Sequence, residues 1–424
     1  MIVTDIKLKQ GKTCELNAKV ETKSEEYSEL FYRLSDEFTQ SVHVSADPFI
    51  AALLIPSMLL GETLTVNAPA SPRLLRSLPK IMAFCHNWNP KYKIIEVRTS
   101  KERQEIDSVS KANALFFSGG VDSFYALTRL TEQTADRNDL SHLLFVHGFD
   151  IRLNDNMLFE KSYAAVKEIA SYYGKRLVLF RTNVREITDK YVRWVNCYGF
   201  AMASVALCGL FRNVYLASER GPNEGYLSLA ASSHPDLDPL WSTDTTTLIH
   251  YGDGISRVEK AKVLANNPMA QKHLRVCMEN RNGAYNCGKC EKCVRTMLAL
   301  HLAGALSKFN FPTKLTPELV KAINLGNPFH ILQSEEILHE LERRGEDQLA
   351  NALSQVLEKK KNLSAGHEKE IEIDALRREL MGIKKCFGYK FMRFYGSIID
   401  QALPDGTKRG EFKRRVLDLL RGSS

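Results

Sequence analysis

Two short stretches of the chain carry residue types that could do chemistry. The first combines hydroxyls, two glycines and a carboxylate in Ser118, Gly119, Gly120, Val121, Asp122 and Ser123. Glycines let successive backbone N–H groups converge on an anion, and serine hydroxyls can add hydrogen bonds to phosphate oxygens. An unpaired Asp122 would repel a phosphate, so we expect it to hold Mg²⁺ or a nearby backbone amide. The run predicts a phosphate-binding loop.

The second stretch holds four of the nine cysteines within seventeen residues. They are Cys277, Cys287, Cys290 and Cys293. Thiolates at this spacing can close a tetrahedron around one zinc ion, and Lys289, Lys292 and Arg295 would offset their negative charge. An iron–sulfur cluster uses similar two-residue spacings, and unligated thiols are the third alternative. The pattern favours a structural zinc site.

The phosphate loop needs a strand before it and a helix after it. Short apolar runs occur at 114–117, 143–146, 177–180 and 214–217, and stretches of helical composition occur at 124–130, 159–173 and 191–211. This alternation predicts an α/β fold with a doubly wound, mainly parallel sheet. Ligands of such sheets bind beyond the carboxyl ends of the strands, where the loop would lie. A Gly-rich turn that only permits tight packing is the alternative.

Two further regions flank the predicted ATP-binding domain, which spans about 112–305 and includes the cysteines. Residues 1–107 predict an α+β N-terminal domain of unknown role, with strands at 1–8, 14–20 and 92–97 and a helix that begins after Ser71. Residues 306–424 predict a helical C-terminal region with helices at 316–325 and 333–361, a linker at 362–366 and a basic tail.

A basic segment at 256–263 begins another predicted helix. Arg257 and Lys260 in it could neutralise phosphate and act as catalytic residues together with Asp122. A solvated charged helix is the alternative. Past the fourth apolar run, the polar residues 219–224 and then His234, Asp236 and Asp238 could recognise a purine or position ammonia, or could merely shape turns.

One histidine and one aromatic residue follow the second apolar run. His147 and Phe149 could line an adenine pocket, and a histidine packed in the core is the alternative.

In this context the run Ser-Gly-Gly-x-Asp-Ser resembles the signature of the PP-loop ATP pyrophosphatase superfamily, whose members expose the α-phosphate of ATP to attack and release pyrophosphate. A PP-loop domain that ends in Cys-x2-Cys-x2-Cys with one cysteine upstream is similar to the 7-cyano-7-deazaguanine synthases, which turn a 7-carboxy-deazapurine into a nitrile with ATP and ammonia. The resemblance spans about 112–305. It implies an adenine-nucleotide alpha-hydrolase-like fold, ATP binding by 118–123, and zinc on the four cysteines. Residues 231–242 do not match that family's substrate motif.

The resulting expectation is a cytoplasmic, ATP-dependent ligase that needs Mg²⁺ and Zn²⁺. It would adenylate a carboxylate or amide oxygen of a small-molecule or nucleobase-like substrate, and a nitrogen nucleophile would then displace AMP. Three alternatives stay open: sulfur transfer with Cys197 or Cys208 as carrier, amide formation, and a non-catalytic nucleotide-binding module. The additional N-terminal domain suggests a protein partner, and a homodimer is also compatible with the sequence.

Composition and charge limit which binding partners and which cellular compartment the sequence is compatible with. Of the formal net charge of +8, residues 384–424 carry +6, since ten Lys or Arg stand against four Asp or Glu there. The positive charge is therefore concentrated in a C-terminal tail, which could be solvated or could contact anionic lipid. Such a distribution argues only weakly for nucleic-acid binding. Residues 1–7 lack a secretory pattern, which with the cysteine usage predicts a reducing compartment. Residues 194–211 lack charge, but their Gly, Ala, Ser and Cys content favours packing on a sheet over a membrane span.

Overall fold

The computed structural model describes residues 1–23, 28–38, 41–102, 112–132, 140–221, 232–280, 283–326 and 328–361. Residues Met1–Leu357 form one compact unit, and a second unit comprises Glu358–Ser424. The predicted linker at 362–366 and the basic tail lie outside the described residues. The division into three domains stays a prediction.

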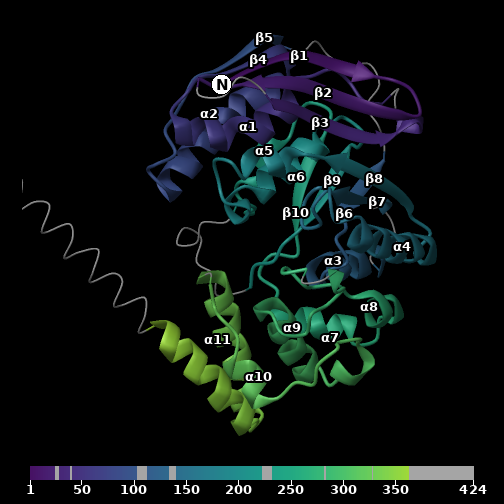
Figure 1. Cartoon of the computed structure of the whole chain (residues 1–424), viewed down its shortest axis with the longest axis vertical. Helices are drawn as coiled ribbons and strands as arrows, with labels where there is room; N and C mark the ends of the chain where they lie inside the picture. Colours follow the sequence, from purple (N-terminus) through teal and green to yellow (C-terminus); the bar gives the residue numbers. More distant parts are fainter. Residues whose placement is uncertain are drawn as a thin grey trace, which may run out of the picture. The chain divides into compact units, whose positions relative to one another are not determined.

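One ten-stranded sheet runs through the first unit (Figure 1), in the order β10-β9-β6-β7-β8-β3-β2-β1-β4-β5. The strands are β1 (Ile2–Lys9), β2 (Thr13–Glu21), β3 (Ser28–Ser35), β4 (Leu64–Ala70), β5 (Val97–Glu102), β6 (Asn113–Phe116), β7 (Leu140–His147), β8 (Arg176–Thr182), β9 (Asn213–Ala217) and β10 (Thr247–Tyr251). Neighbours among β6 to β10 pair in parallel. Counted in their own sequence order they stand 3-2-1-4-5, as in Rossmann-like sheets. The α/β prediction is confirmed.

The N-terminal strands extend this sheet. β3 pairs antiparallel with β8, and β2 and β1 continue from it with antiparallel pairing. β4 and β5 complete this side in parallel register. The strands of the first two predicted domains therefore share one hydrogen-bonded sheet.

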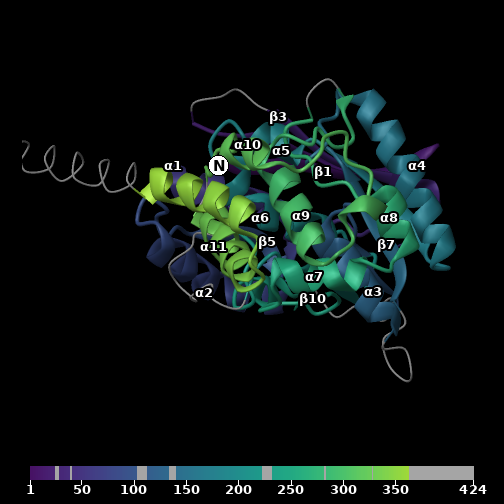
Figure 2. The same ribbon diagram turned by 90° about the horizontal axis from the view of Figure 1, so that it is seen from below.

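Helices cover both faces of the sheet (Figures 1 and 2). They are α1 (Asp47–Leu60), α2 (Pro72–Trp88), α3 (Val121–Glu132), α4 (Asn156–Tyr172), α5 (Val184–Thr188), α6 (Tyr198–Ala206), α7 (Arg257–Leu264), α8 (Pro268–His273), α9 (Glu291–Leu302), α10 (Pro317–Lys321) and α11 (Pro328–Arg343), followed by a helix over 347–361. One core joins α1, α2 and α6 to the sheet, and the other joins α3, α4, α7, α9 and α11. Figure 2 shows α9 between α8 and α11.

The strand before the phosphate loop is buried on both faces. Ala114 and Phe116 belong to one core, while Leu115 and Phe117 belong to the other. Strands covered on both sides read as continuous apolar runs, which is why the sequence predicts the central strands well. β10 was missed because Thr247–Tyr251 contains threonine, histidine and tyrosine and has no such run.

Several local predictions can be compared with the structure. The Ser71 side chain accepts a hydrogen bond from the Leu74 N–H and caps α2, as predicted. The strand predicted at 92–97 is wrong except for its last residue, because residues 93–96 have no regular secondary structure and β5 begins only at Val97. The long helix predicted at 333–361 is interrupted at Gly345, whose φ of +69° suits glycine.

The uncharged stretch at 194–211 is not one helix either. Its main helix, α6, has 9 residues and packs against the buried helix α1 as well as the sheet. Burial between a sheet and a second helix accounts for the missing charges without a lipid environment. No helix in the described ranges is long and apolar enough to cross a membrane.

Gly199 allows α6 to pack closely against the backbone of the segment that follows β9. A Cβ atom there would lie 1.8 Å from the backbone oxygen of Ser232. We therefore predict that Gly199→Ala destabilises the protein by at least about 2 kcal/mol, because a backbone segment rather than a flexible side chain must shift. Denaturant unfolding would measure this. Gly11→Ala, with open space around its Cβ position, is the control and should change stability far less.

Candidate functional site

The run 118–123 lies where the sequence predicts: it follows the carboxyl end of β6 and includes the first turn of α3, which begins at Val121. Gly119 has a φ of +77°, which favours glycine at this turn. The Ser123 hydroxyl donates to the Gly120 carbonyl at 3.1 Å, and the Ser118 oxygen accepts from the Gly120 N–H at 3.4 Å. The loop is thus a short turn at the amino end of a helix, a place that favours anions.

Asp122 is paired with two cations from α7. The Arg257 Nη1 atom lies 3.1 Å from one carboxylate oxygen, and the Lys260 Nζ atom lies 2.9 Å from the other. Lys260 also donates to the Ser218 carbonyl at 2.6 Å. Only 4% of the Arg257 side chain and 1% of the Lys260 side chain are exposed, so a solvated charged helix does not describe α7.

These contacts differ from the expected partners of Asp122. Burial alone would raise the pKa of this carboxyl, but the charges of Arg257 and Lys260 outweigh it and hold the pKa well below its usual range. The expected backbone-amide partner is therefore replaced by two cations. A Mg²⁺ role for Asp122 stays a prediction. The capping box between Ser256 and Glu259 fixes the start of α7 and thereby places both cations.

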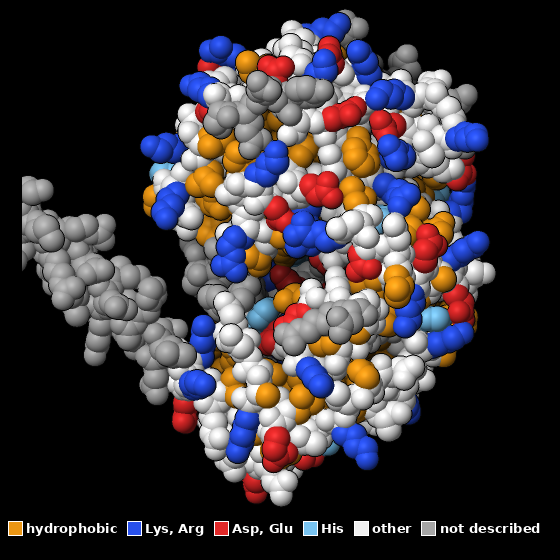
Figure 3. Space-filling model, viewed as in Figure 1, with side chains coloured by type: hydrophobic (Ala, Val, Ile, Leu, Met, Phe, Trp, Pro, Cys, Tyr) orange, Lys and Arg blue, Asp and Glu red, His pale blue; other side chains and the backbone are white. Residues whose placement is uncertain are grey.

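A cavity of about 180 Å³ adjoins the loop. Figure 3 shows a hollow on this face with acidic side chains inside it and basic side chains at its rim. The part of the wall that the sequence predicted comprises Ser118, Asp122, Ser123, Phe149 and Glu219. Polar residues that it missed are Asp150, Tyr198, Ser233, His250, Arg275 and Lys292. They come from separate loops, helices and the strand β10, and apart from Lys292, which lies in the cysteine motif, no local motif marks them.

Glu219 joins the cavity to the C-terminal helices. Its carboxylate accepts a hydrogen bond from the Tyr198 hydroxyl at 2.6 Å, and its carbonyl accepts one from the Gln333 amide at 2.7 Å. The Gln333 side-chain oxygen accepts from Arg257 and from Arg295. Helix α11 therefore supports the ion-pair cluster directly. The predicted polar residues at 222–224 lie outside the described residues.

The other polar side chains predicted for the pocket have different positions. Asp238 is buried and accepts hydrogen bonds from Ser233 and His250, whereas Asp236 is exposed. His234 is buried beside the Phe84 ring.

His147 is a core histidine. Its Nε2 lies 3.0 Å from the Arg152 carbonyl, and its ring stacks on Phe159. Of the two residues predicted to line an adenine pocket, Phe149 alone contributes to the wall of the cavity.

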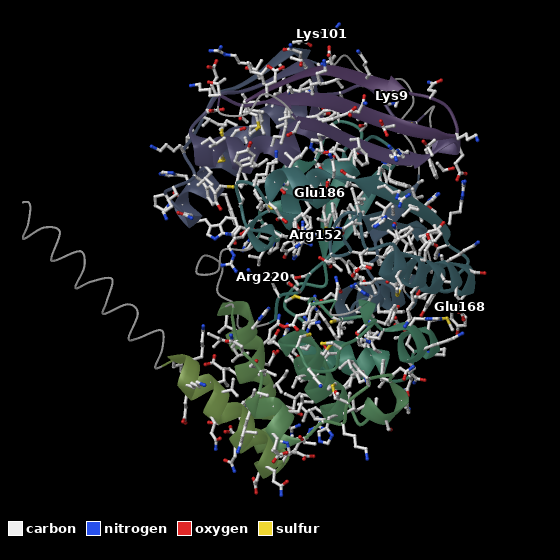
Figure 4. The ribbon with its side chains drawn as sticks, in the orientation of Figure 1. Lys9, Lys101, Arg152, Glu168, Glu186 and Arg220 are labelled. Atoms are coloured by element: carbon white, nitrogen blue, oxygen red, sulfur yellow. The ribbon has the colours of Figure 1, made fainter. Side chains whose placement is uncertain are left out.

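Ion pairs connect neighbouring segments of the first unit (Figure 4). Arg152 pairs with Asp189 at 2.7 Å, and the buried Arg220 lies 3.5 Å from Asp253. Glu168 on α4 pairs with Lys272 on α8.

The four cysteines meet at one point. All four sulfur atoms lie within 4.8 Å of one another and can hold a metal ion such as zinc. With Zn–S bonds of about 2.3 Å, the edges of a sulfur tetrahedron are about 3.8 Å, close to the 4.0 Å between Cys287 and Cys293. A four-iron cluster would hold the sulfurs further apart. The Cys287 sulfur also accepts the backbone N–H of Lys289 and of Cys290, as in a metal-binding knuckle.

This cluster is connected to the phosphate loop. The Asn286 side chain accepts from the Val276 N–H and donates to the Leu274 carbonyl, which ties the two cysteine-bearing segments together. Between Leu274 and Val276, the Arg275 backbone N–H donates to the Gly119 carbonyl at 2.9 Å. The loop and the cysteines are distant in sequence but share this backbone contact.

The positive residues near the cysteines have other partners than expected. Arg295 is buried and pairs with Glu291, and Lys292 lines the cavity. Lys289 is exposed. The cysteine knuckle therefore sets the start of α9 and, through it, directs Lys292 toward the phosphate loop.

Comparisons of the chain with protein-family models, with curated proteins and with solved structures found no match. The chemistry of the site is accordingly inferred from its own residues and contacts.

We expect purified protein to carry about one zinc ion per chain and to be colourless. Cys290→Ser should lose the metal and, because Arg275 braces Gly119, should also loosen the loop at 118–123. Metal analysis and the hydrogen-exchange protection of the loop would test both. Cys85→Ser, a buried cysteine in the other core, is the control and should keep the metal. A brown, iron-containing protein would contradict the zinc assignment.

His330 on α11 should contribute to acid sensitivity. Burial lowers its pKa to about 4, and the nearby Glu291, 3.2 Å away, opposes this only in part. Between about pH 6.5 and pH 4 the unfolded chain binds this proton and the folded chain does not, so stability falls as pH falls through that window. His330→Gln should lose less of its free energy of unfolding than the wild type as the pH falls. Urea unfolding at about pH 7, 6 and 5 would measure this. The exposed His339→Gln is the control.

Proposed function

We propose that the chain is an ATP-dependent ligase of the PP-loop type, similar to the 7-cyano-7-deazaguanine synthases. It adenylates a carboxylate or amide oxygen of a nucleobase-like substrate, such as a 7-carboxy-deazapurine, and releases pyrophosphate. A nitrogen nucleophile then displaces AMP. In this proposal the Rossmann-like half of the sheet is of the adenine-nucleotide alpha-hydrolase type, Mg²⁺ accompanies ATP, and zinc occupies the cysteine site.

One observation carries the proposal: the Gly-rich loop follows the central strand β6 and lies against two buried cations of α7. Strand β6 is at the point where the strand order reverses, and such sheets bind ligands at the carboxyl ends beside that point. Converging N–H groups, hydroxyls and cations are the groups that bind polyphosphates. The loop lacks the lysine of a Walker loop, so this cradle differs from that of γ-phosphate-cleaving enzymes.

In this proposal four cations near the loop stabilise the departing pyrophosphate. Arg257 and Lys260 pair with Asp122, and Arg275 and Lys292 line the cavity beside it. Charge that builds on a leaving group is best stabilised by groups already in place and shielded from water. The apolar part of the wall, which includes Phe117, Val146 and Met202, would keep water away from an adenylated substrate.

The burial of two thiols bears on the sulfur-transfer alternative. Cys197 and Cys208 are each 1% exposed, and burial raises the pKa of Cys197 to about 12 and that of Cys208 further. Thiolates carry sulfur, and a thiol with a raised pKa is a poor nucleophile. The proposal therefore favours a nitrogen nucleophile.

The products of ATP turnover test the proposal. With a panel of 7-carboxy-deazapurines we expect ATP labelled at the α-phosphate to give labelled AMP, and ATP labelled at the γ-phosphate to give labelled pyrophosphate. Asp122→Asn should lower AMP formation by about 10²-fold or more, because it releases the two cations from their positions.

Asp122→Asn also leaves buried cations unpaired, so its melting temperature and metal content must be measured in parallel. Ser123→Ala, which removes one loop hydroxyl, is the milder variant, and Glu132→Gln in the exposed pair at the end of α3 is the control. ADP and orthophosphate as the sole products would contradict the proposal.

A further inference from the structure

A buried histidine on β10 faces the same cavity as the phosphate loop. His250 lines the cavity together with Ser118 and Asp122, and 3% of its side chain is exposed. Its Nδ1 atom lies 2.7 Å from a carboxylate oxygen of Asp238. Its Nε2 atom is buried and makes no hydrogen bond with any residue that the structure describes. The Asp253 carboxylate is 3.7 Å from Nε2, too far for a hydrogen bond.

The partners of Asp238 determine which ring nitrogen carries the proton. Its carboxylate accepts the Ser233 hydroxyl at 2.7 Å and the His234 backbone N–H at 3.3 Å. An ionised carboxylate only accepts hydrogen bonds, so the His250 Nδ1 must be the donor. In the neutral ring the lone pair then lies on Nε2. A carboxylate that orients an imidazole and leaves Nε2 as the proton acceptor is the arrangement of a general base.

A second histidine near the same edge of the sheet shows what a purely structural role looks like. In His147 both ring nitrogens have partners: Nε2 lies 3.0 Å from the Arg152 carbonyl, and Nδ1 accepts from the Arg181 guanidinium at 3.2 Å. In His250 only Nδ1 has a hydrogen-bond partner among the described residues. Buried polar atoms without a partner are rare and destabilising, which points to a ligand that completes the second bond.

We propose that His250, oriented by Asp238, is the base that accepts the proton of the nitrogen nucleophile. This inference rests on the proposed function. The nucleophile's nitrogen forms a bond to the adenylated carbon while one N–H proton moves to Nε2. The C–O bond to AMP breaks, and its electron pair leaves with the AMP oxygen. Asp253, whose side chain is 35% exposed, stabilises the resulting imidazolium and provides a path for the proton to solvent.

The test separates the two half-reactions. Exchange of labelled pyrophosphate into ATP, with a 7-carboxy-deazapurine present, reports adenylation alone. Product formation is then followed with ammonium and, separately, with hydroxylamine, which is largely unprotonated at neutral pH and depends less on a base. His250→Asn is the main variant, because its amide can still donate to Asp238 in place of Nδ1 while Nε2 is removed. His339→Asn is the exposed control.

We expect His250→Asn to keep pyrophosphate exchange within a few-fold of the wild type, to lower transfer to ammonium by about 10²-fold or more, and to recover with hydroxylamine. Asp253→Asn should show a smaller loss in the same direction and is the second variant if His250→Asn does not fold. Because Asp253 also pairs with Arg220, the melting temperature of this variant is measured in parallel. Equal losses of exchange and transfer, or no loss of transfer, would overturn the role of His250 while the proposed function stands. Wild-type protein without exchange would refute the proposed function itself, and this inference with it.

Discussion

The structure around the site depends on the burial of two positive charges. Arg257 and Lys260 are almost fully buried, and a buried cation is strongly destabilising unless an anion lies beside it. Asp122 is that anion, and it can be reached only because the Gly-rich turn brings the start of α3 against α7. The two helices, the loop and the carboxyl end of β6 must therefore form together. Gln333 extends the constraint to α11, since its side-chain oxygen accepts from Arg257 and from Arg295.

The cysteine cluster applies a second constraint to the same loop. Its segments position Arg275, whose backbone N–H binds Gly119, and the start of α9, which carries Lys292 into the cavity wall. A metal ion on the four thiolates would hold both segments in one arrangement, because ligand geometry tolerates little variation. The metal would then also fix the distance between the loop and Lys292, besides stabilising the fold locally. The sequence does not reveal this link, because the loop and the cysteines are far apart along the chain.

The sequence predicts best what is encoded locally. Because β6 is buried on both faces, it appears as a continuous apolar run. The glycines and hydroxyls of the loop and the four cysteines can be recognised by residue type and spacing. It predicts poorly what tertiary contacts decide. β10 has no apolar run, Asp122 takes its partners from a helix more than 130 residues later, and Tyr198 and His250 enter the cavity from elements with no motif. The absence of charge at 194–211 is likewise ambiguous in sequence, since only the covering helix α1 distinguishes a buried segment from a lipid-facing one.

The charges in the cluster also bear on how a carboxylate could belong to the phosphate site that we propose. Asp122 carries one negative charge against the two positive charges of Arg257 and Lys260, and in the cavity wall Arg275 and Lys292 stand against Asp150 and Glu219. The surplus over these residues is one positive charge, so under the proposed function a polyphosphate would not have to displace Asp122. Without a ligand, the carboxylate keeps Arg257 and Lys260 extended toward the loop. In the proposed complex the same cations would share their remaining N–H donors with phosphate oxygens. Asp122 would then favour binding, since side chains that are already held in position cost less to order on a ligand.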